Sequence, residues 1–207
     1  MIKKILSGAM VLAIIFSQGV NAGEKRGTLE KVVNLVQVDN GSARAQEMTT
    51  WAGSQKRWKQ VSEGHELFAG DILRTGPRSV AQIKYDDGNL TRIGSRTNVV
   101  IRDREIKLKR GFLWGKVNKL FSRGLKIFTA SAVASIVGTE FFVEVGKDNS
   151  TMVTVLEGTI ELEGKNGHVL VTEGTYAVID KDGKANDPVA FNKEDVIARY
   201  AEVVYMK

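Results

Sequence analysis

Hydrophobic and polar residues alternate in short runs along most of this chain. Clear examples are residues 79–85 (SVAQIKY), 106–109 (IKLK) and 159–163 (TIELE). Alternation with a period of two is typical of strands that turn one face to a core and the other to water. The pattern therefore predicts about ten or more short strands.

Turn signals separate these runs at intervals of about 8–12 residues. Polar, glycine-containing stretches at residues 86–89 (DDGN), 164–167 (GKNG) and 180–183 (DKDG) suit tight hairpin turns. The spacing predicts one continuous β domain over residues 28–180, built as a roll, a solenoid-like sheet or a sandwich. The predicted fold class is all-β.

Only the end of the chain has a helical pattern. Asn192 suits an N-cap, and Asp195 follows it three residues later. Val196, Tyr200 and Val203 then fall on one face of a helix. Residues 181–207 are predicted to form a linker and a short C-terminal amphipathic helix.

The first 22 residues have the pattern of a secretory signal peptide. Lys3 and Lys4 precede an apolar run over residues 5–16, and small residues end the segment at Ala22. We expect cleavage after Ala22, which would make the protein periplasmic or secreted. The alternative is an uncleaved membrane anchor, but the run is shorter than the ~20 residues of a spanning helix. After cleavage we expect no stable membrane insertion.

Composition narrows the classes further. A hydrophobic content of 43% is sufficient for a core in a chain of 207 residues. The absence of cysteine excludes disulfides, thiolate metal sites, a cysteine nucleophile and the lipidated cysteine of a lipoprotein. Removal of the signal peptide would leave 28 basic residues against 24 acidic ones, a net charge of +4, which permits attraction to anionic partners.

No catalytic or metal-binding pattern is complete. His65-Glu66 begins like a zinc-protease motif but has no second histidine four residues later, and His168 stands beside a hairpin turn. Glu161 and Glu163 alternate with apolar residues, which places them on a solvated strand face. We therefore expect no enzyme activity, no cofactor and no metal site.

A set of glycines and small polar residues marks corners of the predicted β scaffold, because glycine lets the chain turn with a positive φ. The predicted structural positions are Gly70, Asp71, Thr75, Gly76, Gly88, Gly138, Thr139, Glu157 and Gly158.

The order and spacing of these residues resemble the FecR domain. The first half of the resemblance comprises residues 64–76 (GHELFAGDILRTG), 79–81 (SVA) and 87–88 (DG). The second half comprises Leu108, residues 110–111 (RG), 128–130 (FTA), 137–141 (VGTEF) and 155–158 (VLEG). The resemblance implies an exported, all-β, non-enzymatic module. Well-known members of the family are membrane-spanning regulators of extracytoplasmic sigma factors, which relay the state of an outer-membrane iron-siderophore receptor.

Two features differ from those regulators. Only Met1 to Lys4 precede the apolar run, and the segment after residue 180 has room for one helix. A segment that holds a sigma factor and a receptor-contacting subdomain would both need more residues. We therefore expect the resemblance to hold for the fold and the compartment, with sigma-factor signalling as an alternative function.

Residues 102–126 are the strongest lead to a binding surface. They hold nine lysines and arginines against Asp103 and Glu105, with Phe112, Trp114 and Phe121 interleaved. The alternative is a sheet with lysines on its wet face and aromatic residues in its core. The candidate partner-binding residues are Lys107, Lys109, Arg110, Lys116, Lys119, Arg123 and Lys126, together with Trp51 and Trp58 in a polar stretch nearer the N-terminus.

The sequence thus predicts an exported, non-enzymatic binding or scaffold module of the cell envelope. Its partner would be a protein, or an envelope glycan or other anionic polymer bound through residues 102–126; nucleic acid is not expected. A signal-relay component of a sigma-factor and receptor system is the other possibility. The sequence does not predict the oligomeric state. The alternative for Trp51 and Trp58 is that a tryptophan in a polar loop folds back over the edge of the core.

Overall fold

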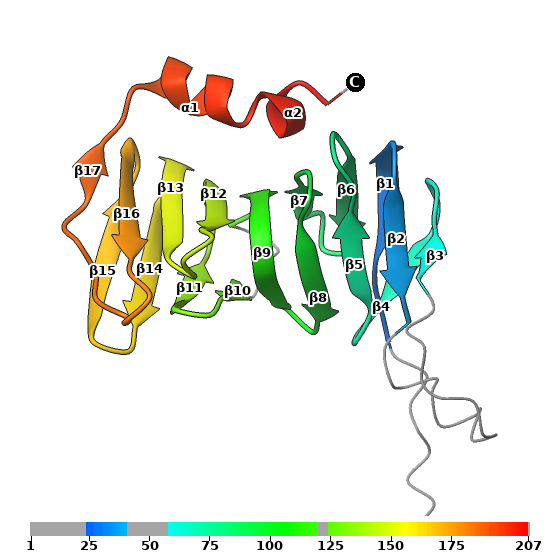
Figure 1. Cartoon of the computed structure of the whole chain (residues 1–207), viewed down its shortest axis with the longest axis horizontal. Coiled ribbons are helices and arrows are strands. Elements are labelled where there is room, and N and C mark those ends of the chain that lie inside the picture. Colours follow the sequence, from blue (N-terminus) through cyan, green and yellow to red (C-terminus); the bar gives the residue numbers. More distant parts are fainter. Residues whose placement is uncertain (1–23, 41–57, 120–123, 207) are drawn as a thin grey trace, which may run out of the picture.

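The computed structural model describes residues 24–40, 58–119 and 124–206. Within them the chain forms one hydrogen-bonded network of 17 strands and two short helices. The strands stand side by side along the long axis of the molecule, and the helices lie over one side of them (Figure 1). The prediction of an all-β fold with a short C-terminal helical segment is confirmed.

The network divides into two layers, sheet A and sheet B. In order across sheet A, the strands are β4 (Glu66–Phe68), β1 (Lys25–Val33), β6 (Val80–Tyr85), β7 (Leu90–Ile93), the second half of β9 (Glu105–Lys116), β12 (Glu140–Val145), β13 (Thr151–Glu157), β16 (Thr175–Ile179) and β17 (Val189–Ala190). In order across sheet B, they are β3 (Lys59–Gln60), β2 (Val36–Asp39), β5 (Ile72–Thr75), β8 (Asn98–Arg102), the first half of β9, β10 (Leu125–Phe128), β11 (Ala132–Ile136), β14 (Thr159–Gly164) and β15 (Gly167–Thr172). All of these pairs are antiparallel except β9 with β10.

Strand β9 joins the two sheets because it bends at Gly111. Gly111 has φ +85°, a conformation that favours glycine. A Cβ atom at this position would lie only 2.2 Å from the Thr97 hydroxyl, so the close approach also requires glycine. Thr97 fixes the bend, since its Oγ1 accepts a hydrogen bond of 3.1 Å from the backbone N–H of Phe112.

The main core lies between the two sheets and is built from the apolar positions of the alternating strands. Ile83 and Leu113 of sheet A and Leu108, Ile127 and Leu162 of sheet B are all fully buried there. Polar neighbours of these residues point outward, as expected for strands with one buried face. The shared core is what makes the two sheets a single sandwich-like unit.

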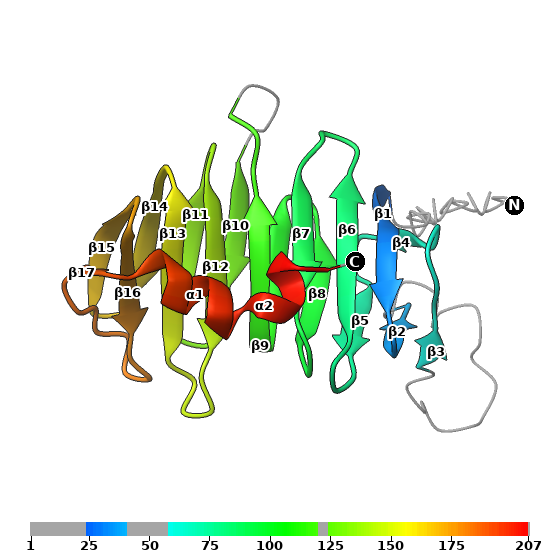
Figure 2. The same ribbon diagram turned by 90° about the horizontal axis from the view of Figure 1, so that it is seen from above.

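A second apolar cluster lies on the outer face of sheet A, beneath the C-terminal helices α1 (Lys193–Arg199) and α2 (Ala201–Val204). The helices cross the strands of this sheet (Figure 2). Asn192 caps α1 by accepting a hydrogen bond of 2.8 Å from the Glu194 N–H. Val196, Tyr200 and Val203 are buried against the sheet, on the one helix face that the sequence predicts.

Among the described residues, the helices are all too short and too polar to cross a membrane.

Candidate partner-binding face

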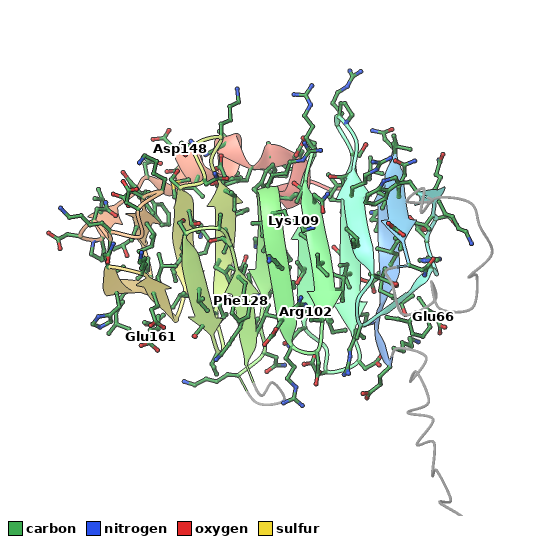
Figure 3. All side chains as sticks on the ribbon, turned by 60° about the horizontal axis from the view of Figure 1, so that its bottom comes forward. Glu66, Arg102, Lys109, Phe128, Asp148 and Glu161 are labelled. Carbon is green, nitrogen blue, oxygen red and sulfur yellow. The ribbon has the colours of Figure 1, made fainter. Side chains whose placement is uncertain are left out.

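The outer face of sheet B lies on the side of the sandwich opposite the helices. Figure 3 shows this side, with Arg102, Lys109, Phe128 and Glu161 labelled on it. Within the described ranges 24–40, 58–119 and 124–206, no helix lies over it. We call it the open face.

An apolar row crosses the open face perpendicular to the strands. Ile72 pairs with Val100, and Val100 with Lys107. Lys107 pairs with Phe128, and Phe128 with Val133. The four apolar members are neither fully buried nor fully exposed, so they offer a half-buried surface to a partner.

Cations flank the apolar row on both of its long sides. On one side, Arg102 and Lys126 both pair with Glu105 on β9, so a carboxylate lies between these two cations. On the other side, Lys109 follows Lys107 along β9 and Arg74 follows Ile72 along β5. Five cations of this face are exposed and form no ion pair with another residue in the described part of the chain: Arg102, Lys107, Lys109, Arg110 and Lys126. Glu105 lies between Arg102 and Lys126 and offsets part of this charge, and the middle of the face keeps an excess of positive charge.

Arg74 is held in place by two contacts. Its guanidinium carbon lies 3.8 Å from the centroid of the Trp58 ring. Its Nε donates a hydrogen bond of 2.8 Å to Oε1 of Gln37 on the neighbouring strand β2. A cation over an aromatic face is an attractive arrangement, so Trp58 serves as a platform that orients Arg74.

The far end of the open face is acidic. Glu161 and Glu163 of β14 point outward and lie opposite Ser135 and Val133 of β11. Leu170 of β15, which pairs with Glu161, is 57% exposed. Charge therefore changes sign from the middle of the sheet toward its β15 edge.

The structure brings some of the predicted binding residues together and separates others. Lys107, Lys109 and Lys126 share the open face, with Arg110 at the bend of β9 and Trp58 beside Arg74. Lys116 lies on the other half of β9, in sheet A, where its Nζ is 3.1 Å from Oε2 of Glu140. Lys119 follows β9 and contacts Gly138. Trp51 and Arg123 lie outside the described residues.

Sequence reasoning missed the apolar row and two of its cations. The apolar members come from four strands that are separate in the sequence: Ile72, Val100, Phe128 and Val133. Two of these strands, β5 and β8, also carry Arg74 and Arg102. Their outward direction follows from the alternation within each strand. Their placement in one row needs the order of strands in sheet B, which alternation does not give.

The interleaved aromatic residues Phe112 and Trp114 do not belong to the open face. Both point from the second half of β9 to the outer face of sheet A, under the C-terminal helices. Trp114 is only 8% exposed, and its Nε1 donates a hydrogen bond of 3.2 Å to Oε1 of Glu140. These two aromatic side chains are packed against other apolar residues, as in the alternative reading, but in the second apolar cluster and not in the core between the sheets.

The predicted structural positions lie at turns and strand ends. Gly70, Gly88, Gly138 and Gly158 all have positive φ. Buried Asp71 accepts a hydrogen bond of 2.9 Å from the Phe68 N–H, and the hydroxyls of Thr75 and Thr139 bond backbone groups of neighbouring segments. The Gly76 N–H donates to the Leu35 carbonyl, and exposed Glu157 pairs with Glu140 across β12 and β13. These positions hold the scaffold together rather than form a reactive centre.

In the described part of the chain, no group of three His, Asp or Glu side chains could hold a metal ion.

A cavity of about 220 Å³ opens at one end of the sandwich. Its lining mixes acidic residues such as Asp86 and Asp103 with basic ones such as Arg26 and Arg104. Arg26 already forms an ion pair of 2.8 Å with Asp103 across this cavity. The open face is therefore the stronger candidate for a functional site.

Comparison with known proteins gives two findings. Two crystal structures of a candidate anti-sigma factor from Parabacteroides distasonis ATCC 8503, at 1.65 and 2.50 Å resolution, share the fold, with TM-scores of 0.53 and 0.52. Both are 14% identical in sequence; the matches cover 62% and 61% of this chain and 63% and 62% of those chains, less than two thirds of their length. At this identity the likeness concerns the fold alone. A comparison with curated proteins finds no match.

The second finding concerns the sequence itself. Residues 71–161 match the model of the FecR protein family. On the structure this segment runs from β5 to β14 and contains every member of the apolar row. The match confirms the resemblance that the motifs indicated over residues 71–161, the central part of this chain, and we call this stretch the FecR-family segment.

Proposed function

We propose that the protein is a non-enzymatic binding module of the cell envelope that takes part in signal relay, and that it binds an acidic surface of a partner protein through the open face. The observation that carries the proposal is the apolar row flanked by unpaired cations on a sheet face that no described element covers. Partly exposed apolar surface that is bordered by charges of one sign is typical of interaction sites.

Two further observations support a regulatory setting. The FecR-family segment forms the centre of the open face, and the fold resembles that of a candidate anti-sigma factor. Export to the periplasm or the cell exterior, after removal of residues 1–22, is part of the proposal because the first residues have the pattern of a signal peptide.

A scaffold role with an envelope glycan or another anionic polymer as the partner is the second candidate. The cluster of Lys107, Lys109 and Lys126 favours it, since a polyanion needs only positive charge. The apolar row and the carboxylates of Glu161 and Glu163 favour a protein instead. A uniform polyanion gains little from apolar side chains and is repelled by acidic ones.

Site-specific cross-linking in the producing cells tests the proposal. A photoreactive amino acid at Phe128 should capture a partner protein, and the same amino acid at Lys147, in the turn between β12 and β13, should not. Replacement of Lys107, Lys109 and Lys126 by Glu should remove the cross-link. The matched control replaces Lys147, Lys165 and Lys184, three exposed lysines away from the open face, and changes the net charge by the same amount.

The identity of the captured partner separates the candidates. A receptor or a membrane regulator supports signal relay, and a structural envelope protein supports a scaffold role. Cross-links to polysaccharide alone, or cross-links at Phe128 that survive the triple substitution, would contradict the proposal. Substrate turnover that a single carboxylate substitution abolishes would contradict its non-enzymatic part.

A further inference from the structure

We infer that the partner segment seated on the open face is an acidic amphipathic α-helix of three to four turns, lying across the strands along the apolar row. The inference rests on the proposed function and names the kind of structure that the face fits.

The opposite face of the same sandwich shows how its sheets seat a helix. Helix α1 crosses the strands of sheet A (Figure 2) and places Tyr200 among aromatic residues of β9 and β12. The ring of Tyr200 stacks on that of Phe142, with centroids 4.2 Å apart. The guanidinium of Arg92 donates hydrogen bonds of 2.7 and 3.3 Å to the carbonyls of Val203 and Val204 at the end of α2. Apolar contacts in the middle and a cation at the side are thus how this fold holds a helix.

The apolar row has the spacing of a helix face. Its members lie on adjacent strands, about 4.8 Å apart. Side chains three or four residues apart on a helix lie about 5–6 Å apart, whereas same-face side chains of an extended peptide lie about 6.6–6.8 Å apart. A helix laid along the row would therefore match the adjacent apolar pairs Ile72–Val100 and Phe128–Val133 better than a strand would, with Lys107 between the two pairs.

The length of the row limits the length of the helix. From β5 to β11 the row spans five adjacent strands, or about 19 Å. At about 1.5 Å per residue, this corresponds to about 13 residues. Asp39 continues the row beyond Ile72, and Glu163 continues it beyond Val133, so a carboxylate marks each end.

The charges around the row select the flanks of the helix. Arg102 and Lys126 stand on one long side with Glu105 between them, and Arg74 and Lys109 stand on the other. A helix with an apolar stripe and with Glu or Asp on both borders of that stripe would meet cations on both sides. A basic helix of the same apolar pattern would be repelled, which gives the face its selectivity.

Selection from a display library tests the inference. Random segments of 16 residues are selected for binding to the intact chain, with counter-selection on a Val100→Glu, Phe128→Glu variant whose fold is verified by circular dichroism. The enriched segments should carry apolar residues at positions i, i+3 or i+4, and i+7, with acidic residues on both borders. As synthetic peptides they should gain helical circular dichroism when they bind.

Variants then locate the site. Lys109→Glu and Arg102→Glu should each raise the dissociation constant of an enriched peptide at least tenfold. Leu170→Glu is the control, because Leu170 is more exposed than the four apolar members of the row but lies on β15, outside it. It should leave the dissociation constant within twofold.

Several results would overturn the inference. They are enrichment of basic or extended segments, absence of any segment that depends on Val100 and Phe128, and a concentration-dependent dimer that Phe128→Glu abolishes.

The experiments distinguish failure of this inference from failure of the proposed function. A cross-link from Phe128 in cells without helix binding in vitro would leave the proposed function standing. Helix binding in vitro without a cross-link in cells would contradict the proposed function.

Discussion

Tyr200 of the C-terminal helical segment stacks on Phe142 of strand β12, with ring centroids 4.2 Å apart and an angle of 13° between the rings. The Tyr200 hydroxyl donates a hydrogen bond of 2.8 Å to Oε2 of Glu144, which also forms an ion pair of 2.8 Å with Arg199. Burial, followed by the nearby Glu144 carboxylate, raises the pKa of Tyr200. This one side chain thus joins the helices to sheet A by both apolar and polar contacts.

Replacing Tyr200 should detach the helical segment from sheet A. Tyr200→Ala removes a buried aromatic ring and is expected to lower the free energy of unfolding by about 3–5 kcal/mol. Tyr200→Phe keeps the ring and loses one partly solvated hydrogen bond, with an expected loss of about 1 kcal/mol. Urea denaturation measures both values.

Tyr205 provides the control, since it is 65% exposed. Tyr205→Ala should change the free energy of unfolding by no more than about 0.5 kcal/mol. If Tyr200→Ala were equally mild, the helices would contribute little to the fold and the second apolar cluster would not stabilise it.

Gly111 should tolerate no side chain, because it stands at the bend that carries β9 from one sheet to the other. Its φ of +85° strains any other residue, and an added Cβ would meet Thr97 at 2.2 Å. Strain and overpacking together are expected to cost about 3 kcal/mol or more in Gly111→Ala. Thermal and urea unfolding of the variant measure the cost.

The matched control is Gly88 in the β6–β7 turn. It has φ +79°, but nothing lies within 4 Å of an added Cβ. Gly88→Ala isolates the backbone strain and is expected to cost about 1 kcal/mol. Equal losses in the two variants would mean that the contact with Thr97 is relieved by a small shift of the chain.

The bend at Gly111 also explains which features the sequence could predict. Ile106, Leu108, Phe112 and Trp114 share one parity, so simple alternation would send all four to the same core. The pairing of β8 with β9 shifts by one residue next to Asn98, and such a bulge reverses the parity of the residues that follow. The outward lysines before the bend were therefore predictable, and the direction of the two aromatic residues after it was not.

The order of strands sets a second limit. The parallel pair β9–β10 places Phe128 beside Lys107, although the two residues lie in separate runs of the sequence. Turn signals predict hairpins between consecutive strands, but they do not predict which hairpins become neighbours. The motifs identified the FecR-family segment, whereas the apolar row became visible only with the register of sheet B.

Trp58 should stabilise the position of Arg74 on the open face. The two side chains stack at 3.8 Å. A double-mutant cycle with Trp58→Ala and Arg74→Ala, read by urea unfolding, is expected to give a coupling energy of about 0.5–1 kcal/mol. Arg74→Lys should lose most of this coupling, because a lysine cannot stack its flat group on the ring. A coupling indistinguishable from zero would mean that Trp58 does not orient Arg74.

Tyr85 should make the stability of the protein fall at high pH. Burial raises the pKa of Tyr85 from 10.0 to about 12. Below about pH 10 the phenol is neutral in both the folded and the unfolded chain, so it adds no pH dependence there. Between about pH 10 and 12 the unfolded chain loses this proton more readily than the folded one, and the free energy of unfolding decreases by up to about 2–3 kcal/mol. The free energy of unfolding is measured for wild type and Tyr85→Phe at pH 8, 10, 11 and 11.5. The wild-type value should fall faster with pH, so that the two curves converge or cross. The curve for Tyr205→Phe should run parallel to that of wild type. A Tyr85→Phe curve parallel to wild type across this range would show that the Tyr85 hydroxyl ionises as readily in the folded chain as in water.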